Sequence, residues 1–120
     1  AILVTTPQQV ALLDVKKALL AFNKLSVPIV GLIENMSYFI CPECGHEENI
    51  FGEGATDEFL KDNKIPLLGK IPIDAAFASS GDRGKPLVLD SDKDYIKVIY
   101  NDLASSLVDR LVKIDWVNPL

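Results

Sequence analysis

Unbroken apolar runs along this chain alternate with longer stretches in which apolar residues recur at helical spacing. The unbroken runs are residues 1–5 (AILVT), 27–33 (VPIVGLI) and 67–71 (LLGKI). Short runs with no polar alternation are typical of strands that are covered on both faces of a parallel sheet. The pattern therefore predicts three parallel strands.

The stretch between the first two runs has the signals of a helix start. Thr6 can serve as N-cap, Pro7 fits the first helical position, and Gln9 completes a capping box. Apolar residues then recur at helical spacing as far as Leu25, which predicts a helix of about 18 residues. Two strands joined by a crossover of this length form a right-handed βαβ unit.

Three further helical segments complete the pattern. We expect a short helix over residues 55–63 that buries Phe59 and Leu60, a helical turn over 74–80, and a closing helix capped by Ser91. The apolar positions of the closing helix are Ile96, Ile99, Leu103, Leu107 and Leu111. The fold class that follows is α/β, a parallel sheet with flanking helices.

Composition narrows the class of protein. The net charge is −5, and no cluster of Lys and Arg offers a surface for nucleic acid or an anionic membrane. Two cysteines, both in one CxxC, do not form a disulfide framework, so we expect a reducing, cytoplasmic location. The chain begins at Ala1, without Met and directly in an apolar run, which leads us to expect a piece of a longer protein.

Polar residues follow the predicted strands at their carboxyl ends, where ligands bind in open α/β sheets. Asn35 follows the second strand, and Pro72 and Asp74 follow the third. An Asn amide both donates and accepts hydrogen bonds and can match the edge of adenine. Alternatively, Asn35 caps a turn and Asp74 caps the next helical turn. The 120 residues contain no GxxxxGK[ST] phosphate loop.

The turn CPECG, residues 41–45, has the sequence of a metal-binding knuckle. Neighbouring N–H groups can support both thiolates, but Cys41 and Cys44 are only two of the four ligands of a tetrahedral site. His46 and one further residue are one completion. A two-fold axis is another, which gives Cys₄ for a [4Fe–4S] cluster or a structural zinc. A redox dithiol and plain structural cysteines are the remaining interpretations.

Several segments together resemble a known family. VTTPQ, ALLD, GLIENMSYFICPECG, IFGEG and LLGKIPID stand in the order and spacing of the Mrp/ApbC group. Members of that group are iron–sulfur cluster carrier ATPases of the deviant-Walker-A branch of P-loop proteins, related to MinD and the nitrogenase iron protein. The similarity extends from the start of the chain to about residue 88.

This resemblance implies roles for particular residues. Cys41 and Cys44 would bridge a [4Fe–4S] cluster across a homodimer, and Asn35, Pro72 and Asp74 would contact adenine. Residues 1–120 would be a single domain, the second half of a P-loop ATPase domain whose phosphate loop precedes them. ATP with Mg would then be bound and hydrolysed by the intact parent, and apo iron–sulfur proteins would receive the cluster. The alternative is a zinc-stapled dimerisation module of a MinD-like ATPase.

Overall fold

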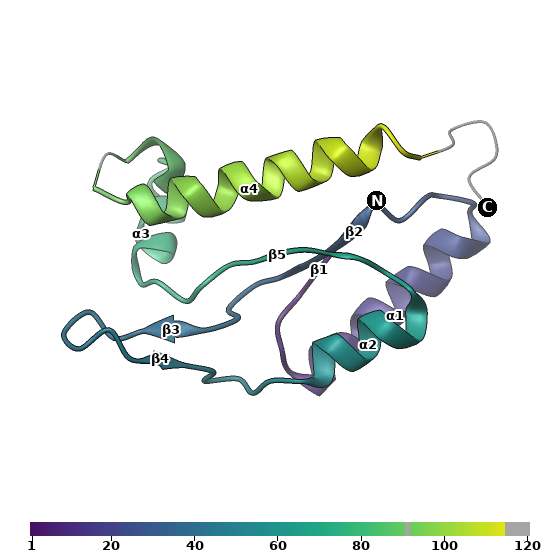
Figure 1. Ribbon diagram of the computed structural model, residues 1–120, viewed down its shortest axis with the longest axis horizontal. Helices are drawn as coiled ribbons and strands as arrows, with labels where there is room; N and C mark the ends of the chain where they lie inside the picture. The colour runs from purple at the N-terminus through teal and green to yellow at the C-terminus, as the bar shows by residue number, and fades with distance from the viewer. Residues whose placement is uncertain (91, 115–120) are drawn as a thin grey trace.

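A three-stranded parallel sheet forms the centre of the molecule (Figure 1). The computed structural model describes residues 1–90 and 92–114. The strands of this sheet are β1 (Ile2–Thr5), β2 (Gly31–Glu34) and β5 (Leu67–Lys70), in the order β1-β2-β5. Both strand pairs are parallel, which confirms the α/β class expected from the apolar runs.

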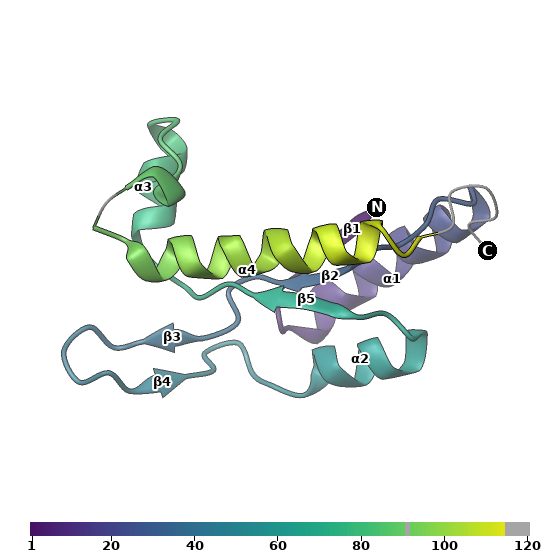
Figure 2. The same cartoon turned by 45° about the horizontal axis from the view of Figure 1, so that its top comes forward.

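Helices cover the two faces of the sheet. Along the chain they are α1 (Gln9–Lys24), α2 (Ala55–Asn63), α3 (Ala76–Asp82), the 3-10 turn η1 (Leu87–Leu89) and α4 (Asp94–Leu111). In Figures 1 and 2, α1 and α2 lie on one side of the sheet and α4 lies along the other. A short antiparallel hairpin, β3 (Phe39–Ile40) and β4 (Glu47–Glu48), projects beyond the end of β2.

Two apolar clusters hold these layers together. On the α1–α2 side the buried residues are Leu3, Leu12, Leu19, Leu32, Phe59, Leu60 and Ile65. On the α4 side Leu68, Ile71 and Leu103 are buried, with Ile33, Phe77 and Ile99 packed against them. Leu32 and Ile33 belong to different clusters because successive side chains of a strand point to opposite faces.

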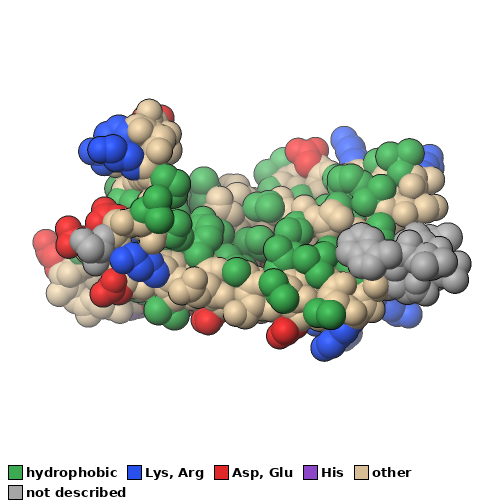
Figure 3. Space-filling view, turned by 90° about the horizontal axis from the view of Figure 1, so that it is seen from above, with side chains coloured by type: hydrophobic (Ala, Val, Ile, Leu, Met, Phe, Trp, Pro, Cys, Tyr) green, Lys and Arg blue, Asp and Glu red, His purple; other side chains and the backbone are tan. Residues whose placement is uncertain are grey.

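We expected both faces of every strand to be covered by helices. This holds for β2 but is wrong for β1. Leu3 is buried, whereas Ile2 is 39% and Val4 57% exposed. The reason is that α4 packs over β5 and, among the described residues, does not extend over β1. Figure 3 views this side and shows hydrophobic side chains gathered in a broad open patch.

Helix boundaries differ from the sequence prediction in informative ways. Helix α1 begins at Gln9, with Gln8 as N-cap and without a side-chain cap. The predicted capping role of Thr6 is therefore wrong, because its hydroxyl donates to Gln8 Oε1 at 3.1 Å instead. Helix α2 has the predicted bounds. Ser91, the predicted cap of the closing helix, lies outside the described residues.

The close contact between α4 and β5 depends on Gly69. A Cβ atom at this position would lie 2.5 Å from Leu103 Cδ2, closer than real Cβ atoms come. The absence of a side chain therefore lets α4 lie directly on β5, where Leu103 is buried. Among the helices of residues 1–90 and 92–114, none is long and apolar enough to cross a membrane.

Candidate functional site

The two cysteines lie in the turn that closes the β3–β4 hairpin. The N–H of Cys41 donates to the carbonyl of His46, and the N–H of Gly45 donates to the carbonyl of Cys41, both at 2.9 Å. Gly45 has φ +72°, a conformation that glycine adopts readily and that most other residues avoid. The chain therefore folds back on itself at CPECG, as its sequence indicated.

Both thiols are free, and they are open to a ligand from outside the chain. Cys41 is half-buried and Cys44 is exposed. The pKa of Cys41 is lowered, first because the backbone N–H of Cys44 donates to its sulfur, and next because the N–H of Glu43 does so too. These contacts favour the thiolate, the form that binds soft metals and iron–sulfur clusters. The residues present therefore fit a thiolate-ligated metal centre.

The described chain does not complete such a centre by itself. Within residues 1–90 and 92–114, no group of three or more His, Cys, Asp and Glu side chains could hold a metal ion. The described residues thus show no preformed completion through His46 and one further residue. The thiol pair can supply two ligands, and the others must come from outside it.

The base of the hairpin is fixed to the segment that continues β5. Ser37 N–H donates to the carbonyl of Ile71 at 2.9 Å, and Ile73 N–H donates to the carbonyl of Tyr38 at 2.7 Å. Phe39 and Ile73 also form a parallel bridge. These bonds place the cysteine turn beside Pro72, Ile73 and Asp74, which lie some thirty residues away in sequence but close in space.

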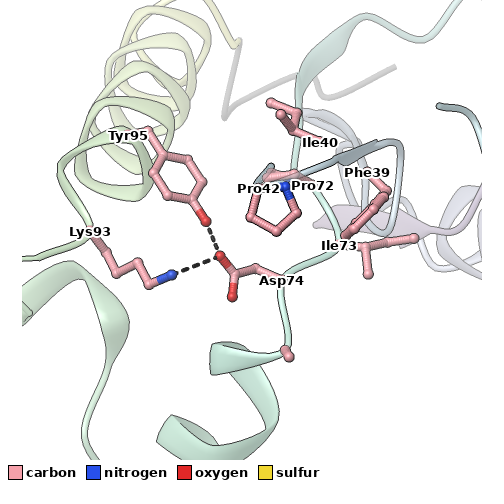
Figure 4. Close-up of a pocket in the computed structure, with 9 residues that line it drawn as sticks. Phe39, Ile40, Pro42, Pro72, Ile73, Asp74, Lys93 and Tyr95 are labelled. Atoms are coloured by element: carbon pink, nitrogen blue, oxygen red, sulfur yellow. Dashed lines mark hydrogen bonds and ion pairs between the residues drawn. The ribbon is translucent and has the colours of Figure 1, made fainter. Parts of the chain in front are cut away.

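A cavity of about 450 Å³ opens between the hairpin, the β5–α3 connection and the start of α4 (Figure 4). This volume is large enough for a small-molecule ligand, and the lining is largely apolar, as in most ligand pockets. The lining residues are Phe39, Ile40, Pro42, Pro72, Ile73, Asp74, Ala75, Lys93 and Tyr95.

Asp74 forms hydrogen bonds with residues from two other parts of the chain around this cavity. Its Oδ1 accepts a hydrogen bond from Ala76 N–H at 2.8 Å, which caps the start of α3. Its Oδ2 accepts from Lys93 Nζ at 3.1 Å and from the Tyr95 hydroxyl (Figure 4). The carboxylate therefore joins the β5–α3 connection to the start of α4.

Sequence reasoning missed Lys93 and Tyr95 as site residues. They lie 19 and 21 positions from Asp74, at the start of a helix that was read only for its buried face. No motif in the sequence marks them. Their role depends on how α4 is placed over the sheet, and this placement is tertiary information.

The predicted adenine-contacting residues are divided in space. Pro72 and Asp74 line the cavity, whereas Asn35 is absent from its described lining. Asn35 lies at the end of β2, where its N–H donates to the carbonyl of Thr5 at 2.6 Å and its Oδ1 accepts from Met36 N–H at 2.9 Å. Asp74 thus accepts from the first N–H of α3, although Ala75 is the N-cap residue of that helix, and Asn35 accepts from the N–H of the next residue.

Taken together, the parallel sheet and the cavity beyond its carboxyl edge define an α/β protein of the nucleotide-binding type, whose hairpin turn carries two free thiols. The family model described as "ParA: NUBPL iron-transfer P-loop NTPase" matches residues 1–108, and the chain belongs to this family. This finding confirms the resemblance to the Mrp/ApbC group of carriers.

Relatives and a solved structure agree with this assignment. The "Iron-sulfur cluster carrier protein" of Pyrococcus horikoshii is 46% identical over 114 residues, which is 95% of this chain and 38% of that protein. The protein of the same name from Escherichia coli K12 is 39% identical over 111 residues, 92% of this chain and 30% of that protein. The chain thus spans 38% or less of the length of these relatives.

A nucleotide-binding protein from Archaeoglobus fulgidus, described as a complex with ADP and with cobalt, has a similar structure. The TM-score is 0.60 at 36% sequence identity, over 71% of this chain and 35% of that one. The likeness agrees with a nucleotide-binding P-loop fold for the described sheet and helices.

Proposed function

We propose that the protein carrying this chain binds an iron–sulfur cluster and delivers it to apo-proteins, with ATP turnover controlling the handover. The observation that carries the proposal is the pair of free, accessible thiols of Cys41 and Cys44, at the tip of a hairpin whose N–H groups favour the thiolate. Membership of an iron-transfer family and the carrier names of the relatives support it.

The cluster is proposed to be a [4Fe–4S] centre held between two copies of the protein. One chain supplies two thiolates, and a cubane cluster takes four cysteine ligands. A two-fold axis beside the hairpin tip brings two such pairs together, because the same surface meets itself across that axis. The partner completes the ligand set, which no group within the described residues does.

ATP is proposed to place its adenine in the cavity lined by Pro72 and Asp74. The cavity has the volume and the apolar walls of a ligand site, and a similar protein of known structure is described as a complex with ADP. We further propose that Asn35, which lies at the end of the neighbouring strand β2 and outside the cavity lining, reaches the edge of the base from there. The phosphates and Mg would be held outside these 120 residues, which contain no GxxxxGK[ST] loop.

Anaerobic purification with metal analysis and visible absorption spectroscopy tests the carrier role. We expect a brown protein that contains iron and sulfide, and Cys41→Ala or Cys44→Ala should lose the metal and weaken the dimer together. His46→Ala is the matched control in the same hairpin and should keep the metal. A colourless protein with tightly bound zinc would favour the zinc-stapled dimerisation module instead, and full metal retention by a strict monomer would contradict the shared site.

A further inference from the structure

One of the two residues between the cysteines, Pro42, is also part of the cavity wall. Pro42 lines the cavity together with Pro72 and Asp74, and it is joined by a peptide bond to Cys41. Figure 4 shows Pro42 beside Pro72, with Tyr95 facing them and Asp74 close by. A group bound in the cavity would therefore contact the turn that holds the thiols.

One side of the cavity is fixed by the sheet. Pro72 is buried, and its neighbour Ile71 donates its N–H to the carbonyl of Glu34 at 2.9 Å. Asp74 is held by donors from three residues. A ligand has little freedom to displace this side, because each displacement would break several hydrogen bonds within a packed region.

The part of the cavity wall that the hairpin supplies is held much less firmly. Pro42 is exposed, and the hairpin that carries it consists of two strands of two residues each. Such a short ladder contributes little stability of its own. The proline ring restricts rotation about its own backbone, so a displacement of Pro42 is passed to Cys41 rather than absorbed in the turn.

This geometry points to Pro42 as a positioning residue that couples the nucleotide to the thiols: a base in the cavity packs against Pro42 and orders the cysteine turn. The inference rests on the proposed function, in which the cavity takes the adenine and the thiols take the cluster. Because coupling between two sites is reciprocal, a metal on the thiols changes ADP affinity by the same factor by which ADP changes metal affinity.

Alkylation of the thiols measures the coupling between nucleotide and thiols without an assay of the cluster-bound protein. The protein is expressed from its complete gene and used in its reduced, metal-free form. We expect saturating Mg-ADP to slow the reaction of Cys41 with iodoacetamide by about fivefold, because a base packed against Pro42 holds the turn in one arrangement and restricts access to the half-buried thiol. Tripolyphosphate, which has phosphates and no base, should leave the rate unchanged. The slowing should also be independent of protein concentration over a tenfold dilution, because the contact lies within one chain.

Two variants of the same turn separate the role of the proline ring from a general effect on the hairpin. Pro42→Ala should reduce the effect of ADP to less than about twofold, although it still binds ADP. Glu43→Gln, which changes an exposed neighbour outside the cavity lining, should keep the full effect. The reciprocal arm measures ADP affinity by calorimetry with and without Zn²⁺ on the thiols, and Pro42→Ala should again lose the difference.

The outcomes separate this inference from the proposed function. If the wild-type protein binds both ADP and metal but shows no effect of one on the other, Pro42 does not couple the sites and the carrier role stands. The inference would also be overturned if Pro42→Ala and Glu43→Gln reduced the effect of ADP on the alkylation rate equally. The same holds if tripolyphosphate slowed alkylation by itself, or if the slowing by ADP disappeared on dilution. Failure to bind either ADP or metal would overturn the proposed function as well.

Discussion

Cys41 differs from an ordinary cysteine because two backbone N–H groups donate to its sulfur, from Cys44 first and from Glu43 next, and these contacts lower its pKa. A lowered pKa means that the thiolate persists to lower pH than in an unfolded chain. Since the thiolate is the form that attacks an alkylating agent, Cys41 should keep its reactivity at lower pH when the hairpin is folded.

Alkylation as a function of pH checks this expectation in a Cys44→Ser variant, which keeps the backbone donors and leaves one thiol. The pH of half-maximal rate should be lower in the folded protein than in the same variant unfolded in urea. The same midpoint in both states would show that the N–H contacts do not stabilise the thiolate.

The contacts of Asp74 lead to a second prediction at the scale of a single residue. Its carboxylate accepts from Lys93, Tyr95 and the N–H of Ala76, and its side chain is only 15% exposed. Asp74→Asn removes the charge opposite Lys93, so we expect a loss of about 1 kcal/mol in the free energy of unfolding, since hydrogen bonds to charged groups exceed neutral ones. Urea denaturation measures this loss, and ADP affinity should fall with it.

Asp94→Asn is the matched control for this change. Asp94 pairs with Lys97 at 3.7 Å, and its side chain is 87% exposed. An exposed pair of this kind contributes little, so the free energy of unfolding should change by less than about 0.5 kcal/mol. Equal effects of the two substitutions would show that Asp74 does not hold the start of α4.

At the scale of secondary-structure elements, the contact of α4 with β5 is sensitive to a substitution at Gly69. Gly69→Ala would place a Cβ atom 2.5 Å from Leu103 Cδ2, so α4 must move or Leu103 must leave its preferred rotamer. We expect a loss of about 1–3 kcal/mol in the free energy of unfolding, the usual cost of overpacking. Thermal unfolding of the variant measures it.

Gly81→Ala in α3 is the control, because a Cβ atom there meets nothing within 4 Å. It should be neutral or slightly stabilising, as is usual for alanine in a helix. A second substitution, Leu103→Ala, should cost less in the Gly69→Ala background than in the wild type, since the clash is then relieved. Additive losses would contradict the assigned contact.

At the scale of the whole molecule, the open side of β1 is the feature that favours association with other chains. Val4 is 57% exposed, and within residues 1–90 and 92–114 the far edge of β1 has no partner strand. Unpaired strand edges and large apolar patches favour association with other chains. The 120 residues on their own should therefore associate, and Val4→Lys should reduce the association measured by light scattering.

Leu13→Lys is a suitable control, because Leu13 is also exposed, at 64%, but lies on α1 away from this edge.

Calorimetric titration of the same 120 residues with Mg-ATP should show no useful affinity, because the groups that hold phosphates in P-loop proteins are not among them. A cooperatively folding monomer that binds ATP at micromolar concentration would contradict both expectations.

The sequence by itself determined those features that depend on neighbouring residues. Unbroken apolar runs predicted β1, β2 and β5, helical spacing predicted α1, α2 and α4, and CPECG predicted the hairpin turn with its two thiols. These features follow from backbone preference and hydrophobic period, both of which are local. The family could also be recognised from motif order, since the segments that carry it are short and specific.

Only the tertiary structure decided how these parts meet. It placed Pro42 in the same cavity wall as Pro72, brought Lys93 and Tyr95 to Asp74, and left Asn35 apart from the cavity lining. It also exposed one face of β1, because α4 lies over β5. Such contacts join residues far apart in sequence and depend on how helices pack on the sheet, which no local period or propensity encodes.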